Sequence, residues 1–308
     1  GLMHKMGLIR NSFRLFIGWV LVSTMILFNV TKGGAQQPGR NGEPLLESGR
    51  AEKLLPPGGT SKDLKIVSYN IRWRAGKELQ EIAHWLKSSE APAPSIIGLQ
   101  EVDRAKKRTG CANNAKALAE SLGMYYAWAA PHSPEKGKTK EEETGVVLLS
   151  PYPLADITRL VLTNDGPGGR SRVALGATIK IGKTPVRVYS VHAETRLPLW
   201  QKIDQLRVVL DDLAKFPKAT PAIVLGDFNA WELPTIDAVR KLFTEAGFTT
   251  PVPDDESTYA RKVLGFEMKL KLDWIWVHGM IPQAYGIDRG LKVSDHFPVW
   301  AVVKLPAD

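Results

Sequence analysis

The chain has 308 residues, 44% of them apolar, which is enough for one large core or two small domains. Its single cysteine, Cys111, excludes an intramolecular disulfide and a cysteine-based zinc cluster. The formal net charge of +9 favours phosphate-bearing partners, but no long lysine and arginine block indicates a nucleic-acid-binding tail.

Residues 1–35 have the composition of an export segment. A basic stretch without acidic residues precedes the apolar run LFIGWVLVSTMILF over residues 15–28. This pattern favours a secretory signal peptide cleaved before Gln36, with a retained membrane anchor or a buried helix as alternatives. A signal peptide or an anchor would place the rest of the chain outside the cytoplasm.

Residues 36–62 are rich in glycine, proline and polar residues, as in QQPGRNGEP and LLPPGGTSKD, which predicts a flexible linker. From residue 63 onward, short β-branched runs alternate with helical stretches and turn signals. We therefore expect one domain over residues 63–308.

Eight apolar runs predict strands: Leu64–Tyr69, Ile96–Gln100, Val146–Leu149, Val173–Ile181, Val186–His192, Ala222–Leu225, Leu272–Val277 and Pro298–Val303. Four stretches predict helices: Glu78–Lys87, Asn113–Leu122, Trp200–Ala214 and Thr235–Glu245. In the third helix, Ile203, Leu206 and Val209 recur at the spacing of one buried face. These elements predict a mixed α/β domain with helices packed outside the sheets.

Polar side chains stand at one end of most of the predicted strands. They are Asn70, Glu101, His192, Asp227, Asn229, Asp273, Asp295 and His296. Each of them alone is typical of a cap or a turn. Because strand ends of an α/β sheet converge on one crevice, together they predict a shared site.

The chemistry of these side chains narrows the kind of site. Carboxylates and amides are hard oxygen ligands, which favour Mg²⁺, Mn²⁺ or Ca²⁺ over Zn²⁺. Two imidazoles beside them can hydrogen-bond a phosphate or move a proton near neutral pH. No strand end offers a cysteine or the serine elbow of an acyl hydrolase. The set therefore favours metal-assisted hydrolysis at phosphorus.

Six motifs carry a resemblance to a known family. VSYNIRW, IIGLQEVD, YSVHAET, LGDFNA, LDWIWV and SDHFPVW occur in the order of the endonuclease/exonuclease/phosphatase superfamily, over residues 64–303. The chain resembles its small exported bacterial members. The resemblance implies a DNase I-like four-layer α/β sandwich, with two mixed, mostly antiparallel β-sheets packed face to face and helices outside. The motifs are specific for the superfamily but not for a substrate, because its members share them.

The resemblance also implies a divalent-metal site. Asn70, Glu101 and Asp295 would bind the ion, with Glu101 as the principal ligand. We expect Mg²⁺, with Mn²⁺ or Ca²⁺ as alternatives.

The catalytic roles that the resemblance implies fall on the remaining strand ends. Asp227 would orient or deprotonate the attacking water, and Asn229 would hold a phosphate oxygen. His192 would hydrogen-bond the phosphate. His296, oriented by Asp273, would stabilise the developing charge or transfer a proton.

An arginine completes the implied phosphate site. Arg172, in SRVAL, matches a family position and could clamp phosphate through two hydrogen bonds; its neighbour Arg170 is the alternative. A second basic stretch, YARKVLGFEMKLK over residues 259–271, contains the apolar residues Leu264 and Phe266 and is a candidate membrane-facing or substrate loop.

Three enzymatic functions remain open at this point. We favour an extracytoplasmic, metal-dependent phosphodiesterase that acts on lipid head groups or other organic phosphodiesters. The alternatives are a secreted or periplasmic DNase I-like nuclease and a phosphomonoesterase for small organic phosphates. An inactive protein that only binds a phosphate ligand is the alternative of another class. We expect a monomer that is secreted, periplasmic or associated with the membrane through its N-terminal segment.

Overall fold

The computed structural model describes residues 45–56, 63–88, 96–131 and 143–305. The predicted signal peptide or membrane anchor over residues 1–35 lies outside these ranges, as do both ends of the predicted linker. Within the described ranges, no helix is long and apolar enough to cross a membrane.

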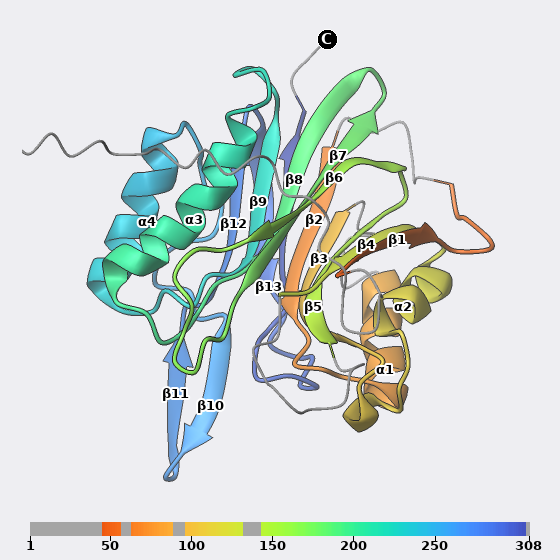
Figure 1. The fold of residues 1–308 in the computed structure, drawn as a ribbon, viewed down its shortest axis with the longest axis horizontal. Helices are drawn as coiled ribbons and strands as arrows, with labels where there is room; N and C mark the ends of the chain where they lie inside the picture. The colour runs from red at the N-terminus through yellow and green to blue at the C-terminus, as the bar shows by residue number, and fades with distance from the viewer. Residues whose placement is uncertain (1–44, 57–62, 89–95, 132–142, 306–308) are drawn as a thin grey trace, which may run out of the picture. The chain divides into compact units, whose positions relative to one another are not determined.

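Two mixed β-sheets form the centre of the described part (Figure 1). The larger sheet has seven strands in the order β1 (Leu46–Arg50), β4 (Tyr125–Ala129), β5 (Glu143–Ser150), β3 (Ile96–Arg104), β2 (Asp63–Asn70), β14 (Val299–Lys304) and β13 (Ile281–Ile287). The smaller sheet has five strands in the order β12 (Asp273–His278), β9 (Ala222–Asp227), β8 (Thr184–His192), β7 (Val173–Ile181) and β6 (Leu154–Val161). A separate hairpin consists of β10 (Tyr259–Val263) and β11 (Phe266–Leu270).

Helices lie on the outer face of each sheet (Figure 1). α1 (Gly76–Lys87) and α2 (Asn114–Leu122) cover the larger sheet, whereas α3 (Leu199–Leu213) and α4 (Leu233–Glu245) cover the smaller one. A short 3-10 helix, η2 (Lys107–Thr109), precedes α2. The sequence defines these helices locally, as in α2, where the Asn113 side chain caps the first turn and Gly123 ends the last in a left-handed conformation.

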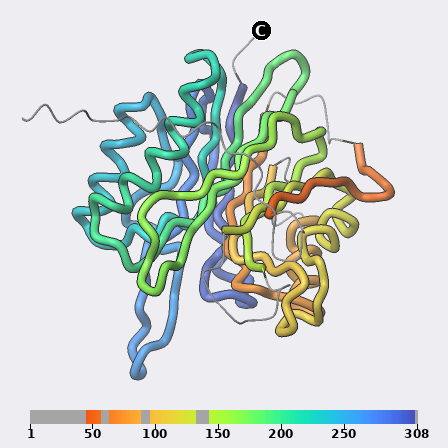
Figure 2. The backbone as a smooth tube through the Cα atoms, viewed as in Figure 1, coloured from red at the N-terminus to blue at the C-terminus, as the bar shows by residue number. Residues whose placement is uncertain are grey.

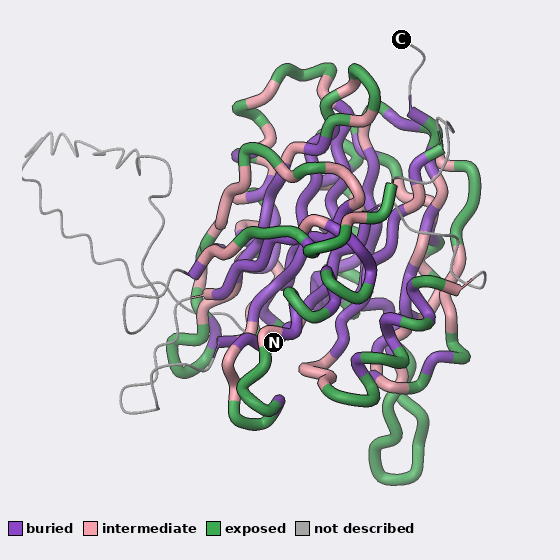
Figure 3. Tube along the Cα trace, turned by 90° about the vertical axis from the view of Figure 1, so that its right-hand side faces the viewer, coloured by how far each residue is buried: buried purple, intermediate pink, exposed green. Residues whose placement is uncertain are grey.

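Three apolar cores separate the four layers. One core lies between the larger sheet and its helices, with Leu99 and Leu118 among its members. A second lies between the two sheets, and a third, which includes Phe243 and Trp276, lies between the smaller sheet and its helices. The inner strands of both sheets are therefore buried along most of their length (Figure 3). This arrangement confirms the four-layer DNase I-like sandwich of two mixed sheets with helices outside.

The register of the smaller sheet explains how polar strand ends meet. β8 and β9 are parallel, and His192 pairs with Asp227 at their carboxyl ends. β12 runs antiparallel to β9, so that Asp273 at its start also pairs with Asp227. In the facing sheet the parallel pair β2–β3 ends with Asn70 opposite Gln100. Two parallel pairs therefore direct their polar ends toward one edge of the sandwich.

All eight predicted strands and all four predicted helices are present, with boundaries that differ by a few residues. The buried face predicted for α3 is confirmed, because Ile203, Leu206 and Val209 are buried. The predicted linker over residues 36–62 is wrong for part of the chain. β1 pairs with β4 at the edge of the larger sheet, and Leu45 before it is buried in the outer core. Glycine and proline on both sides of this short strand conceal it in the sequence.

Candidate active site

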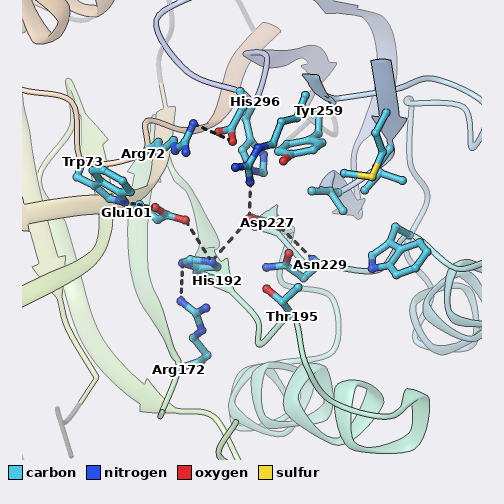
Figure 4. Close-up of a pocket in the computed structure, with 16 residues that line it drawn as sticks. Arg72, Trp73, Glu101, Arg172, His192, Thr195, Asp227, Asn229, Tyr259 and His296 are labelled. Atoms are coloured by element: carbon cyan, nitrogen blue, oxygen red, sulfur yellow. Dashed lines mark hydrogen bonds and ion pairs between the residues drawn. The ribbon is translucent and has the colours of Figure 1, made fainter. Parts of the chain in front are cut away.

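A pocket of about 410 Å³ opens at the edge where the polar strand ends meet (Figure 4). Seven of the nine predicted site residues line it: Glu101, Arg172, His192, Asp227, Asn229, Asp295 and His296. The other two, Asn70 and Asp273, are fully buried behind the pocket wall and contact lining residues. The structure therefore brings together the complete predicted set.

Asp227 lies at the centre of the pocket because Gly226 precedes it. Gly226 has a φ of 141°, and a Cβ atom there would lie 2.0 Å from the carbonyl oxygen of Val191 on the neighbouring strand. Only glycine fits this close approach. Because side chains alternate along the chain, Phe228 then points into the core between the smaller sheet and its helices, where it stacks on Trp274.

The Asp227 carboxylate is held by hydrogen bonds from two sides. Its Oδ1 accepts from the backbone N–H of Asn229 at 3.0 Å, and its Oδ2 accepts from Asn70 Nδ2 at 3.0 Å. The same Oδ2 lies 3.7 Å from Nε2 of His192 and 3.7 Å from Nε2 of His296 (Figure 4). Burial raises the pKa of Asp227 to about 7, the value that suits a general base near neutral pH.

His296 is paired with a buried carboxylate. Its Nδ1 lies 2.8 Å from Oδ2 of Asp273, which is fully buried. Burial alone would lower the pKa of His296, but the carboxylates of Asp273 and Asp227 outweigh it and raise the pKa to about 10. His296 is therefore an imidazolium at neutral pH, and its Nδ1 donates to Asp273.

His192 lies against a cation instead. Its Nδ1 is 3.4 Å from Nη1 of Arg172 (Figure 4). Burial, followed by the charge of Arg172, holds the pKa of His192 well below its usual range. The imidazole is therefore neutral, and because a guanidinium can only donate, Nδ1 is the accepting nitrogen. The proton then resides on Nε2, which faces Asp227 and lies 3.9 Å from Glu101 Oε1.

One carboxylate that holds this side of the pocket was missed in the sequence. Glu194 is fully buried and binds the guanidinium groups of both Arg170 and Arg172, the latter with Nε at 2.8 Å. These hydrogen bonds lower the pKa of Glu194 despite the effect of burial. Both candidate arginines are thus anchored, but only Arg172 lines the pocket. In the sequence Glu194 is an acid two residues after His192, and nothing there links it to the Arg-x-Arg pair at 170–172.

Glu101 lies on the opposite wall at an irregular point of β3. The register of β3 against β5 shifts between Leu99 and Val102, and Glu101 has a φ of +55°. Its Oε2 accepts from the indole nitrogen of Trp73 at 2.5 Å, and its Oε1 accepts from Asn70 at 3.2 Å. The bulge thus turns the carboxylate out of the sheet and into the pocket.

Trp73 and Arg72 are further pocket residues to which the sequence interpretation assigned no role. Both have left-handed backbone conformations, with φ of 53° and 47°. The backbone N–H of Arg72 donates to Asn70 Oδ1 at 3.0 Å, and its guanidinium lies 3.1 Å from Asp295 Oδ2. Arg72 therefore adds a positive charge to those of Arg172 and Arg261 around the pocket.

The chemistry of the donor set fits a divalent cation. Glu101 and Asp295 supply hard oxygen atoms in the pocket, and Glu101 keeps a quarter of its side chain exposed. Asn70 lies behind the wall, with its Nδ2 on Glu101 and its Oδ1 accepting the backbone N–H of Arg72. Asp227, Asp273 and His296 also bring one ligand atom each to within 4.8 Å of one another. The imidazolium of His296 has no lone pair for a cation, so we assign that cluster to the Asp–His pair and the base.

Comparisons with known proteins agree with this geometry. The model of the Endonuclease/Exonuclease/phosphatase family matches residues 67–296. No curated protein matches the chain. An endonuclease/exonuclease/phosphatase from Beutenbergia cavernae has 20% identity and a TM-score of 0.62, over 79% of this chain and 72% of that one.

Two further solved structures share the fold. Mannosyl-6-phosphatase Bt3783 from Bacteroides thetaiotaomicron has 17% identity and a TM-score of 0.58, over 78% of this chain and 99% of that one. D. rerio TDP2, complexed with a single-strand DNA product, has 15% identity and a TM-score of 0.59, over 78% and 98%. With the family model spanning the pocket residues from Asn70 to His296, the chain belongs to the endonuclease/exonuclease/phosphatase family of metal-dependent phosphoester hydrolases.

Proposed function

We propose that the chain is an extracytoplasmic phosphodiesterase that acts on lipid head groups or similar organic phosphodiesters. One observation carries the reaction type. A single oxygen of Asp227 lies 3.7 Å from two imidazoles, one neutral and one cationic. A base between a neutral hydrogen-bond donor and a fixed cation is suited to water attack on a phosphoryl group.

Each side chain has a role in this reaction. Asp227 takes a proton from the attacking water, and its pKa of about 7 makes the ionised form predominant above neutral pH. His192 donates its Nε2 hydrogen to a phosphate oxygen, and Arg172 pairs with the same phosphate. The imidazolium of His296 stabilises the charge that develops on the reacting oxygens. Asn229 was expected to hold a phosphate oxygen, but its Nδ2 donates to the carbonyl of Ala193 at 3.0 Å, so its role is to keep Asp227 in place through its backbone N–H.

The metal site lies beside this group. Glu101 would hold the cation, with Asn70 and Asp295, and the chemistry a bound Mg²⁺ supplies there is charge neutralisation on the phosphate. Asn70 contributes without the ion as well, because its amide hydrogen-bonds both Glu101 and Asp227. It thereby fixes the spacing between the base and the principal ligand.

The composition of the pocket wall supports an organic diester as substrate. Tyr259, Met268, Leu270 and Leu272 give the pocket an apolar lining, with Arg261 among them. An organic group attached to a phosphate therefore has apolar neighbours close to the cationic ones. The extracytoplasmic location of the protein is proposed from the composition of residues 1–35, which lie outside the described structure.

Hydrolysis of bis-p-nitrophenyl phosphate tests the reaction type. We expect Mg²⁺-dependent turnover by the wild type and almost none by His296→Ala. Equal, negligible activity of both proteins would contradict the phosphodiesterase. A panel of sphingomyelin, phosphatidylinositol, phosphomonoesters and supercoiled plasmid then separates the substrate classes, and the lipids are expected to be cleaved best.

A nuclease is the second candidate. The net charge of +9 and the three arginines that line the pocket favour a polyanionic substrate. Nicking of supercoiled plasmid without cleavage of any lipid in the panel would replace the lipid proposal with this one.

A further inference from the structure

The β10–β11 hairpin is the feature that the proposed reaction leaves unexplained. Its two strands form a sheet of their own and belong to neither larger sheet, and one isolated bridge joins Tyr259 to His296. The chain runs out along β10 and returns along β11, so the hairpin projects beyond the sandwich (Figures 1 and 2). It is exposed over most of its length (Figure 3). An isolated hairpin of this kind gains little stability from packing.

The base of the hairpin is fixed directly to the catalytic residues. Ala260 donates its backbone N–H to the carbonyl of Asp295 at 2.9 Å. The Thr258 hydroxyl accepts the backbone N–H of Asp273 at 2.9 Å, and the Tyr259 ring packs edge-on against His296. The orientation of the hairpin is therefore set by the pocket itself.

The strand register gives the hairpin two different faces. Tyr259 pairs with Leu270, Arg261 with Met268 and Val263 with Phe266. Because side chains alternate across a strand, these six share one face, and four of them line the pocket: Tyr259, Arg261, Met268 and Leu270. A largely apolar surface, interrupted only by Arg261, thus runs from the catalytic pocket to the end of the hairpin.

The tip extends this apolar face into solvent. Leu264 and Phe266 are 95% and 81% exposed, and Leu264 has a left-handed φ of 49° in the turn. Exposure of two large apolar side chains to water at the end of a projecting hairpin is unfavourable in free energy. Within the described ranges both side chains are uncovered and belong to none of the three cores, so they are accessible to a binding partner.

The charges near the tip indicate what that partner is. Arg261, Lys262 and Lys269 stand on the hairpin, and Glu267 is its acidic residue, paired with Lys269 at 3.1 Å. The hairpin is therefore cationic behind an apolar tip. An anionic lipid surface has the matching order, since its hydrocarbon interior lies behind negatively charged head groups.

We propose that the β10–β11 hairpin is a lipid-docking element that inserts Leu264 and Phe266 into an anionic membrane surface and guides a lipid head group into the pocket. Only the guidance of a head group into the pocket rests on the proposed function. Membrane docking by the hairpin does not depend on it. The apolar face from Val263 and Phe266 to Leu270 takes the hydrocarbon part of the substrate, while its phosphate reaches Asp227. The long basic side chains beside the tip lie at the level of the head groups.

A polarity-sensitive fluorophore at the tip tests docking without any need for catalysis. It is attached to Leu264→Cys in the full chain, in a Cys111→Ser background because Cys111 is exposed. The matched control carries the fluorophore at Ile281→Cys, an apolar position of β13 that is 61% exposed. Vesicles of phosphatidylcholine with phosphatidylglycerol are added in the presence of a chelator, so that no lipid is cleaved.

We expect a blue shift of the fluorophore at 264 and none at 281. The paired positions make this readout independent of any membrane contact by residues 1–35. No shift at 264, or equal shifts at both positions, would overturn the proposal. A shift at 264 with duplex DNA but not with vesicles would overturn the lipid assignment in favour of nucleic acid.

Turnover provides the second arm. Leu264→Ser combined with Phe266→Ser is expected to lower the ratio of vesicle-lipid to bis-p-nitrophenyl phosphate hydrolysis about tenfold or more, since burying each side chain is worth at least that factor. Ile281→Ser is expected to leave the ratio unchanged. An unchanged ratio in the double variant would contradict docking.

The two proposals fail in different ways. A shift at 264 in a protein that cleaves no phosphoester would support docking and contradict the phosphodiesterase. Cleavage of the soluble diester without a shift at 264 would support the phosphodiesterase and contradict docking.

Discussion

The two sides of the pocket use the same side chain under opposite electrostatic conditions. His192, on the β8 side, lies beside Arg172 and is neutral. His296, on the β12 side, lies beside Asp273 and is cationic. Both rings are buried and both are 3.7 Å from the same oxygen of Asp227, so their neighbours and not their exposure set the difference.

This contrast divides the work between the two imidazoles. The neutral ring can donate one hydrogen bond without adding charge, whereas the cationic ring carries a fixed charge against which the base and the phosphate are positioned. A site that pushes the pKa values of two like groups apart obtains two functions from one residue type. The acid–arginine group around Glu194 and the buried Asp273 are what maintain the separation.

The largest expected effect is at the residue that both sides share. Asp227→Asn keeps the shape of the side chain but removes the base, and we expect kcat to fall about a thousandfold. The thermal unfolding midpoint should stay close to that of the wild type, because an amide oxygen can still accept the backbone N–H of Asn229. A variant that unfolds instead would show that Asp227 is a turn residue.

Neutral amide substitutions separate the two histidines directly. His192→Gln retains a neutral N–H donor, so we expect it to be about tenfold more active than His192→Ala. His296→Gln cannot supply a charge and should be as inactive as His296→Ala, about a hundredfold or more below the wild type. Steady-state kcat values with a soluble diester give the comparison. Equal rescue at both positions would contradict the difference in protonation state.

Replacement of Glu194 tests how the arginines beside the neutral His192 are held in position. Glu194→Gln removes the anion that holds Arg170 and Arg172, so the arginine fork loses its fixed orientation. We expect KM for a soluble diester to rise about tenfold while kcat changes less, because phosphate binding is weakened more than the chemistry. Arg172→Lys, which keeps the charge but not the fork, should reproduce the effect. A fall in kcat alone would contradict this positioning role.

The smallest expected effect is on the pH dependence of stability, measured by urea unfolding with a chelator present. The pKa of His296 rises from 6.5 to about 10 on folding, so its contribution is fully present below pH 6.5 and is lost toward pH 10. His296→Gln should therefore cost stability near neutral pH and cost less as the pH rises.

His192 should show the opposite slope. Its pKa is lower in the folded protein than the usual 6.5, so the unfolded chain takes up the proton first and stability falls as the pH drops below 6.5. His192→Gln should then gain stability relative to the wild type between about pH 7 and about pH 5. Slopes of the same sign for the two variants would contradict the contrast.

The elements that could be predicted from the sequence are those that bury most of their side chains. β2, β3, β5, β7, β8 and β9 lie inside the sheets and have continuous apolar runs. The missed strands β1, β6 and β13 are sheet edges, where half or more of the side chains meet solvent and the apolar signal is lost. β4 is buried but has only five residues directly after α2.

The site divides in the same way. Polar residues that end a strand, such as Asp227 and His192, could be identified because the apolar run before them marks the strand end. Glu194 and Trp73 could not, because each acts through a partner distant in the chain, Arg172 and Glu101, and that contact depends on register. The irregular turn at Glu101 has no sequence signal either, since glutamate does not favour a left-handed backbone.

The left-handed backbone at Arg72, Trp73 and Glu101 has a consequence for the evolution of stability. Each such residue costs about 1–2 kcal/mol relative to glycine, a sizeable share of the about 5–15 kcal/mol that stabilises a typical domain. Selection for heat resistance alone would favour glycine at position 73. That change would remove the indole hydrogen bond that holds Glu101 in the pocket. At position 73, the substitution that would most readily stabilise the protein would therefore also lower its activity.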